Sequence, residues 1–213
     1  MSSDVLVTTP AQRQTEPHAE AVSRNRRQQA TFRKVLAAAM ATLREKSYAD
    51  LTVRLVAARA KVAPATAYTY FSSKNHLIAE VYLDLVRQVP CVTDVNVPMP
   101  IRVTSSLRHL ALVVADEPEI GAACTAALLD GGADPAVRAV RDRIGAEIHR
   151  RITSAIGPGA DPGTEFALEM AFFGALVQAG SGTFTYHEIA DRLGYVVGLI
   201  LAGANEPSTG GSE

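Results

Sequence analysis

The sequence predicts an all-α protein of about nine helices, and two observations lead to this fold class. Apolar residues recur every three or four positions along most of the 213-residue chain, which is the period of a helix with one buried face. Proline and glycine clusters separate these stretches, and no segment has the sustained alternation of apolar and polar residues that a half-buried strand requires. With 47% hydrophobic residues, the helices can bury a core.

The predicted organisation has two folded parts between two tails. Residues 1–24 are polar and contain two prolines, so we expect a disordered tail there. Residues 25–73 are expected to form a helix-turn-helix domain. Residues 74–204 form a second helical domain, whose first helix, 74–89, links the two parts. Residues 205–213 are expected to form a second disordered tail.

The first helix is amphipathic and braces the motif that follows it. Its apolar positions lie 3, 1, 3, 1 and 3 residues apart, which places them on one helical face. These positions are Phe32, Val35, Leu36, Ala39, Met40 and Leu43.

Two short helices joined by a tight turn are predicted over residues 51–74. Thr52 can cap the first of them, and Val62 suits the turn as its buried anchor. Pro64 fits the first turn of the next helix, where a missing N–H costs nothing. The outer face of that helix carries short, polar and aromatic side chains. This layout is typical of a helix-turn-helix, whose second helix enters the major groove of DNA.

Nine side chains in or before this motif are predicted to contact double-stranded DNA. The outward-facing residues of the second helix should meet the groove, and those at its end should hold phosphates, with Lys74 at a helix N-terminus. Two arginines ahead of the first helix are expected to follow the phosphate backbone or enter the minor groove. The set is Arg26, Arg27, Thr52, Arg54, Thr66, Tyr68, Thr69, Tyr70 and Lys74.

The run YTYFSSK, from Tyr68 to Lys74, is the most specific part of this region. Together with Thr52-Val53, Val56-Ala57, Ala60, Val62 and Thr66, it resembles the tetracycline-repressor (TetR) family of bacterial transcription regulators over about residues 30–82. The chain departs from the family where Lys61, Ala63 and Ala65 replace the usual glycine, serine and glycine. We therefore expect a positive φ at Lys61 and weaker capping at Ala63.

The charge distribution separates the two parts of the chain. Residues 1–80 hold 12 lysines and arginines against 6 acidic side chains, a net charge of +6. The remaining residues hold 9 basic and 16 acidic side chains, a net charge of −7. A basic head on an acidic body is the electrostatic pattern of a DNA-binding domain attached to a part that does not bind DNA.

The second domain is predicted to continue with five helices after the linker helix. Their apolar positions span about residues 103–114, 120–128, 137–152, 162–181 and 186–203.

Small residues recur every four positions in the last two of these helices, which favours close helix packing. The first of the two is apolar nearly all round and must be covered on several sides. The stripes can pack within one chain, or they can meet a second subunit. The family resemblance implies the second case, a homodimer formed by a four-helix bundle. The predicted interface residues are Ala171, Ala175, Gly194 and Gly198.

The family resemblance also implies a pocket for a small molecule between the fourth and eighth helices. The candidate lining residues are apolar, so the ligand is expected to be hydrophobic, with His109 as a polar anchor. Each of these residues can equally be an ordinary core residue, and a lone histidine is more often structural. The candidates are Val86, His109, Leu110, Val114, Ala127, Phe172, Phe173 and Leu176.

No metal, nucleotide or catalytic motif is found, so we expect no enzyme, no metal and no cofactor. No apolar run approaches a membrane span and no signal segment is apparent, so a cytoplasmic protein is expected. The favoured function is a ligand-responsive repressor that binds a palindromic operator as a dimer. The alternative is a helical carrier or enzyme for an apolar small molecule, without DNA binding.

Overall fold

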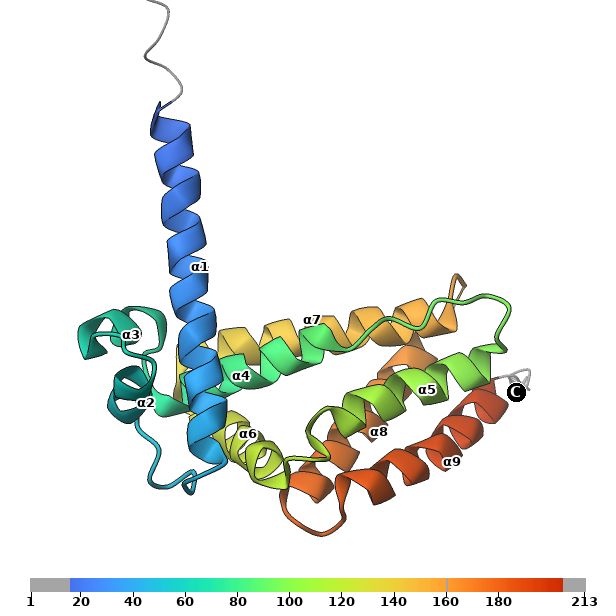
Figure 1. Cartoon of the computed structure of the whole chain (residues 1–213). Helices are drawn as coiled ribbons and strands as arrows, with labels where there is room; N and C mark the ends of the chain where they lie inside the picture. Colours follow the sequence, from blue (N-terminus) through green and yellow to red (C-terminus); the bar gives the residue numbers. More distant parts are fainter. Residues whose placement is uncertain (1–15, 160, 205–213) are drawn as a thin grey trace, which may run out of the picture.

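The computed structural model describes residues 16–159 and 161–204 and has no strand over those ranges, which confirms the all-α prediction (Figure 1). Short 3-10 helices follow α5 and α6, at Leu112–Val114 and Gly131–Ala133. The α-helices of this part of the chain are α1 (Glu16–Leu43), α2 (Val53–Arg59), α3 (Pro64–Tyr70), α4 (Lys74–Gln88), α5 (Met99–Ala111), α6 (Pro118–Asp130), α7 (Pro135–Ile156), α8 (Pro162–Gly180) and α9 (Tyr186–Ala204).

The first helix begins earlier than the sequence predicts. The expectation of a disordered tail as far as residue 24 is wrong over residues 16–24, because α1 begins at Glu16. Pro17 lies in the first turn, where a proline is tolerated, and the following alanines and glutamate favour a helix. The other residues of the two predicted tails, 1–15 and 205–213, lie outside the described residues.

Helices α1–α3 form an N-terminal domain, and α4 runs from it into a body made of α5–α9 (Figure 1). Aromatic packing at the end of α3 holds the N-terminal domain together. Phe71 is fully buried and stacks on Phe32 of α1, with ring centroids 5.0 Å apart. This contact fixes α3 against α1, so the outer face of α3 has a defined position relative to the rest of the domain.

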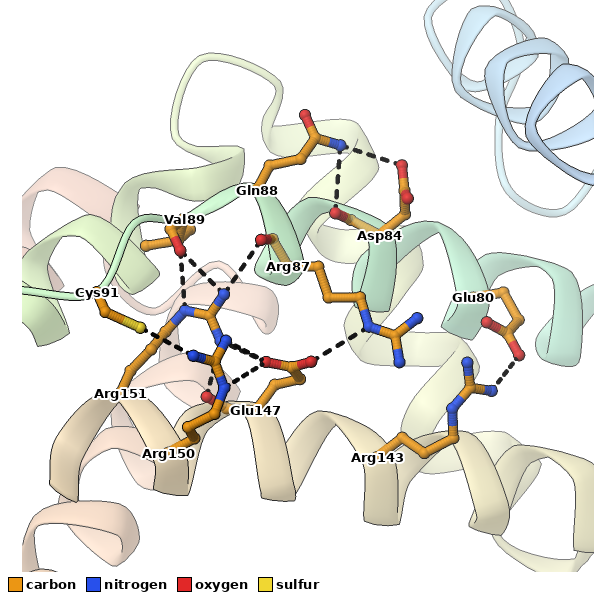
Figure 2. Close-up of polar contacts among 10 residues, drawn as sticks. All are labelled: Glu80, Asp84, Arg87, Gln88, Val89, Cys91, Arg143, Glu147, Arg150 and Arg151. Atoms are coloured by element: carbon orange, nitrogen blue, oxygen red, sulfur yellow. Dashed lines mark hydrogen bonds and ion pairs between the residues drawn. The ribbon is translucent and has the colours of Figure 1, made fainter. Parts of the chain in front are cut away.

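Helix α4 lies parallel to α7, and polar contacts join the two helices in the same order along both (Figures 1 and 2). At the end near the N-terminal domain, the Ser73 hydroxyl donates to Asp134 Oδ2 at 2.9 Å. One to two turns further on, Arg143 of α7 donates to Glu80 of α4 at 2.6 Å. These contacts connect the first part of α4 to the body.

The far end of α4 is held by a buried arginine of α7. Arg151 is 1% exposed and donates to the Val89 carbonyl from Nε and Nη2, at 3.0 and 2.9 Å. It also donates to the Arg87 carbonyl at 3.2 Å and to Glu147 Oε2 at 2.7 Å (Figure 2). The last carbonyls of a helix lack partners within the helix, so Arg151 satisfies groups that would otherwise be buried without hydrogen bonds.

A second buried arginine does the same for the end of α7. Arg102 of α5 donates to the carbonyls of Ala155 at 2.8 Å and Ile156 at 2.9 Å, and to that of Val97 at 2.6 Å. Positive charge near a helix C-terminus also opposes the negative end of the helix dipole. The arginines therefore link α5 to α7 and α7 to α4 through helix ends.

Glu147 of α7 lies among three arginines at the end of α4. Its carboxylate accepts hydrogen bonds from Arg150 at 2.8 Å and from Arg151 at 2.7 Å, and from Arg87 at 3.3 Å. The contacts with Arg150 and then Arg151 lower the pKa of Glu147 from 4.5 to about 2, against the opposing effect of burial. The carboxylate is therefore ionised in the folded protein at neutral pH.

Glu147 should make the stability of the protein depend on pH below 4.5. Its pKa is lower in the folded than in the unfolded state, so its contribution is present above about 4.5 and is lost as pH falls towards about 2. We expect Glu147→Gln to flatten the dependence of unfolding free energy on pH across this window. Urea unfolding at a series of pH values measures it. Asp142→Asn, on the same helix but without an ion pair among the described residues, should keep the wild-type slope.

None of the described helices is both long enough and apolar enough to cross a membrane.

Candidate nucleic-acid interface and interior cavity

The sequence places the turn between α2 and α3 as predicted. Thr52 caps α2 by accepting a hydrogen bond from the Leu55 N–H at 3.1 Å. Lys61 has a φ of 54°, the left-handed conformation expected where a lysine replaces the usual glycine. Pro64 occupies the first turn of α3, and Ala63 before it provides no side-chain cap. The expected weak start of α3 is therefore present.

Helix α3 turns a polar face outward. Its one buried residue is Ala67, and Thr66, Tyr68 and Thr69 are exposed, with Tyr68 51% exposed. The Thr69 hydroxyl donates to the Ala65 carbonyl at 3.0 Å, so its lone pairs remain available as acceptors. This face has the size and chemistry to approach base edges in a major groove.

Exposed basic residues lie on the two helices that precede α3. Arg26 and Arg27 are exposed on α1, and Arg54 is exposed on α2 beside Thr52. The structure brings Thr52 and Arg54 to the start of α2, while Arg26 and Arg27 lie on the free part of α1 that extends beyond the rest of the molecule (Figure 1).

The two predicted phosphate ligands at the end of α3 are partly engaged within the protein. Lys74 donates from Nζ to the Tyr48 carbonyl at 3.2 Å and lies 4.4 Å from the centre of the Tyr48 ring. Tyr70 is half-buried and packs edge-on against Phe32. Sequence reasoning missed Tyr48, which also donates from its hydroxyl to Asn75. Tyr48 holds the first turn of α4 against the loop after α1, and no local sequence pattern indicates that contact.

An apolar cavity of about 310 Å³ lies in the body, between α4, α6, α7, α8 and the start of α9. Of the predicted ligand residues, Phe173 and Leu176 line it. The others do not. Five of them are packed in the core, which agrees with the alternative considered for each: Val86, Leu110, Val114, Ala127 and Phe172.

His109 does not line this cavity and lies instead at a separate hollow between α5 and α9, so its role as a polar anchor stays a prediction. That hollow is lined by Arg108, Gly194 and Gly198 as well. A side chain at position 109 of α5 therefore points towards α9, away from α6 and α7.

Polar groups in the cavity come from residues that the sequence analysis did not select. Tyr82 of α4, Cys124 of α6 and Tyr186 of α9 all line the cavity. Burial raises the pKa of Tyr82 and Tyr186, and raises that of Cys124 to about 12, so all three are neutral at physiological pH. Arg141 is the one charged side chain among the described lining residues.

The two predicted interface glycines of α9 have different surroundings. A Cβ at Gly194 would lie 3.3 Å from Thr104 Cγ2 of α5, so the glycine allows the two helices to approach closely. Gly198 is exposed, with open space at its Cβ position. Ala171 and Ala175 of α8 are half-buried and line a groove between α8 and α9.

Large apolar side chains on α8 and α9 are exposed on the single chain. Phe166 is 65% exposed, Met170 56%, Tyr195 72% and Leu199 57%. These four residues define what we call the α8–α9 apolar face. Exposed apolar patches of this kind mark interaction surfaces, because a soluble protein gains free energy when they are covered.

Known proteins resemble this chain at two levels, a family model that matches its N-terminal part and solved structures that match most of its fold. Residues 35–81 match the model of bacterial regulatory proteins of the tetR family. A TetR transcriptional regulator from Rhodococcus sp. RHA1 is 21% identical, with 85% of this chain and 99% of that chain covered and a TM-score of 0.69. FadR of Thermus thermophilus, a TetR-family repressor solved with lauroyl-CoA, is 17% identical (85% and 99% covered, TM-score 0.61). SmeT, solved as a triclosan complex, is 19% identical (86% and 98% covered, TM-score 0.53).

The match covers the helix-turn-helix, and the structural likeness extends over 85% of the chain. Residues 35–81 therefore match the tetR family of bacterial regulatory proteins, and the described part of the chain has the all-helical fold of that family's regulators.

Proposed function

We propose that this protein is a transcriptional repressor that binds a palindromic operator as a homodimer and responds to a hydrophobic small molecule. The observation that carries the proposal is the exposed polar face of α3, set on a tetR-family helix-turn-helix. Thr66, Tyr68 and Thr69 supply the base contacts, and Tyr70 and Lys74 supply phosphate contacts. Thr52, Arg54, Arg26 and Arg27 add contacts to the backbone.

The α8–α9 apolar face supports the homodimer. Four large apolar side chains more than half exposed need a cover, and a twofold axis brings the same face of a second copy onto it. Ala171 and Ala175 lie in the adjoining groove, whereas Gly194 faces α5 of its own chain, so we put Gly194 beside the proposed interface and the exposed Gly198 within it.

The apolar cavity supports the response to a hydrophobic molecule. Tyr82 belongs to α4, the helix that leads to the helix-turn-helix, so a molecule bound there contacts the element that positions α3. The solved complexes of FadR with lauroyl-CoA and SmeT with triclosan provide precedents for small molecules with apolar parts on this fold. Ligand can change operator affinity only by binding one arrangement of the dimer more tightly than another.

A helical carrier or enzyme for an apolar molecule is the competing function, and the cavity alone is compatible with it. Titration with a palindromic fragment taken from beside the gene separates the two. The proposed repressor binds that fragment with a strong salt dependence and prefers it to a scrambled fragment of equal length. Equal affinity for both fragments would favour the carrier or enzyme.

We expect graded effects within the DNA-contacting surface. Lys74→Ala should weaken binding to all DNA sequences alike and reduce the salt slope by about one phosphate contact. Thr69→Ala should change the preference among operator variants and leave the slope unchanged. Lys46→Ala is the matched control, because this exposed lysine lies beside α6 rather than α3. If Lys74→Ala behaves like Lys46→Ala in the salt titration, Lys74 serves only to hold Tyr48.

A further inference from the structure

The apolar cavity contains one hydrogen-bonding group that the protein leaves unused. Tyr82 is 5% exposed, and its hydroxyl has no hydrogen-bond partner among the described residues. The residue lines the cavity from α4. Buried hydroxyl groups are nearly always hydrogen-bonded, because a buried donor without a partner costs free energy. The hydroxyl oxygen itself has almost no accessible surface, so a partner in the cavity would reach it through a small shift of the surrounding side chains.

A second tyrosine in the same wall provides an internal comparison. The Tyr186 hydroxyl is hydrogen-bonded to Thr125, and Tyr186 also fills the space next to Gly121, where a Cβ would lie 2.4 Å from the hydroxyl oxygen. Tyr186 is thus packed and satisfied by the chain itself. The two tyrosines share the cavity but differ in what they offer to a bound molecule.

The charges of the wall limit the ligand further. Arg141 is the one charged group among the described lining residues, and its guanidinium donates to the Leu128 carbonyl at the end of α6. No carboxylate is present in the described wall to pair with a positive charge. A cation entering the cavity would lose its water without a compensating partner and would meet a guanidinium.

We propose that the cavity binds an apolar molecule that carries a hydrogen-bond acceptor of the carbonyl type and no positive charge, with the Tyr82 hydroxyl donating to that acceptor. This inference deepens the proposed function and rests on it for its regulatory meaning. The rest of the molecule is held by apolar contact with residues such as Phe173 and Leu176. A cavity of about 310 Å³ lies at the small end of the usual range for ligand sites, so the molecule is compact.

The test uses matched probes of known structure on the full chain. One flexible set is 4-phenyl-2-butanone, butylbenzene and 4-phenylbutan-2-amine, which differ in the acceptor and the charge at one position. One rigid pair is 9-fluorenone and fluorene. Calorimetry or thermal shift gives the affinity of each probe. At least one ketone should bind about tenfold more tightly than its hydrocarbon, and the amine should bind more weakly than both of its partners.

Tyr82→Phe then isolates the proposed anchor. The substitution removes only the unpaired hydroxyl, so the fold and melting temperature should be kept and the ketone preference should disappear. Tyr186→Phe is the matched control and should keep the preference, because its hydroxyl is already satisfied by Thr125. Hydrocarbon affinity should be the same in all three proteins.

The inference is overturned if no ketone binds, if ketone and hydrocarbon bind equally, or if the two variants lose the ketone preference alike. Operator titration of the same proteins keeps the two proposals apart. Sequence-specific DNA binding without a ketone preference would reject the proposed ligand class and keep the proposed repressor function. The opposite result is a ketone preference that depends on Tyr82 in a protein that does not prefer its operator. It would keep the proposed ligand site and reject the proposed repressor function.

Discussion

Replacing Arg151 with methionine is expected to lower the free energy of unfolding by about 3–5 kcal/mol. Methionine replaces the aliphatic stem of the arginine but donates no hydrogen bonds. The buried Val89 carbonyl would then lose both of its donors, the Arg87 carbonyl would lose one, and Glu147 would lose one of its arginines. Removing one partner from a buried charged cluster costs more than the cluster itself contributes, because the remaining groups stay buried.

The neighbouring arginine provides the control. Arg150 also contacts Glu147, but its side chain is 55% exposed. Arg150→Met should therefore change stability by less than about 1 kcal/mol. Urea unfolding followed by circular dichroism measures both variants. Equal midpoints for Arg151→Met and wild type would mean that water or a local shift satisfies the end of α4 as well as the guanidinium does.

The second large effect is expected at the α8–α9 apolar face. Leu199→Glu places a charge on a side chain that is 57% exposed in the single chain and is buried in the proposed dimer. The dimer should dissociate, and each subunit would then bind one half-site by itself. Joining two binding sites raises apparent affinity by about 100- to 10,000-fold, so the loss of operator affinity should be at least about 100-fold.

Sedimentation at several protein concentrations, alongside operator titration, tests this result. Val95→Glu is the matched control, since Val95 is 84% exposed in the segment between α4 and α5 and lies on neither α8 nor α9. It should stay dimeric and bind the operator normally. A Leu199→Glu variant that remains dimeric would place the interface elsewhere, and Gly198→Leu would then test the side of α9 that the sequence first indicated.

Much of the helical order could be predicted from the sequence because apolar spacing and helix-ending residues are local. The cap at Thr52 and the exposed face of α3 follow from residues within a few positions of each other, and the left-handed turn at Lys61 follows from the family resemblance. The sequence predicts a start of α1 that is too late. Polar residues and prolines favour disorder, but polar residues also suit an exposed helix.

The functional interior could not be predicted in the same way. Arg150 and Arg151 are adjacent and chemically identical, and only a rotation of about 100° around α7 makes one exposed and the other buried. Tyr82 looks like a normal apolar neighbour of Val81 until the positions of α6 and α8 show that nothing reaches its hydroxyl. Such distinctions depend on contacts between distant helices, which no spacing along one helix contains.

The unequal attachment of α4 to α7 determines where that helix can pivot. Near the N-terminal domain the contacts are single side-chain pairs, Ser73 with Asp134 and Glu80 with Arg143. At the far end, Arg151 holds backbone carbonyls that cannot move away without unwinding the chain. We therefore expect the far end to act as the fulcrum of α4, with the Lys74 end moving when the side-chain pairs part.

Simple leverage then sets the scale of the movement. Helix α4 has 15 residues, which gives an arm of about 22 Å at about 1.5 Å per residue. A tilt of about 5° about the fulcrum carries the Lys74 end through about 2 Å. In a twofold dimer both arms swing together, so the two copies of α3 change their spacing by up to about 4 Å, enough to take one out of register with a groove while the other is seated.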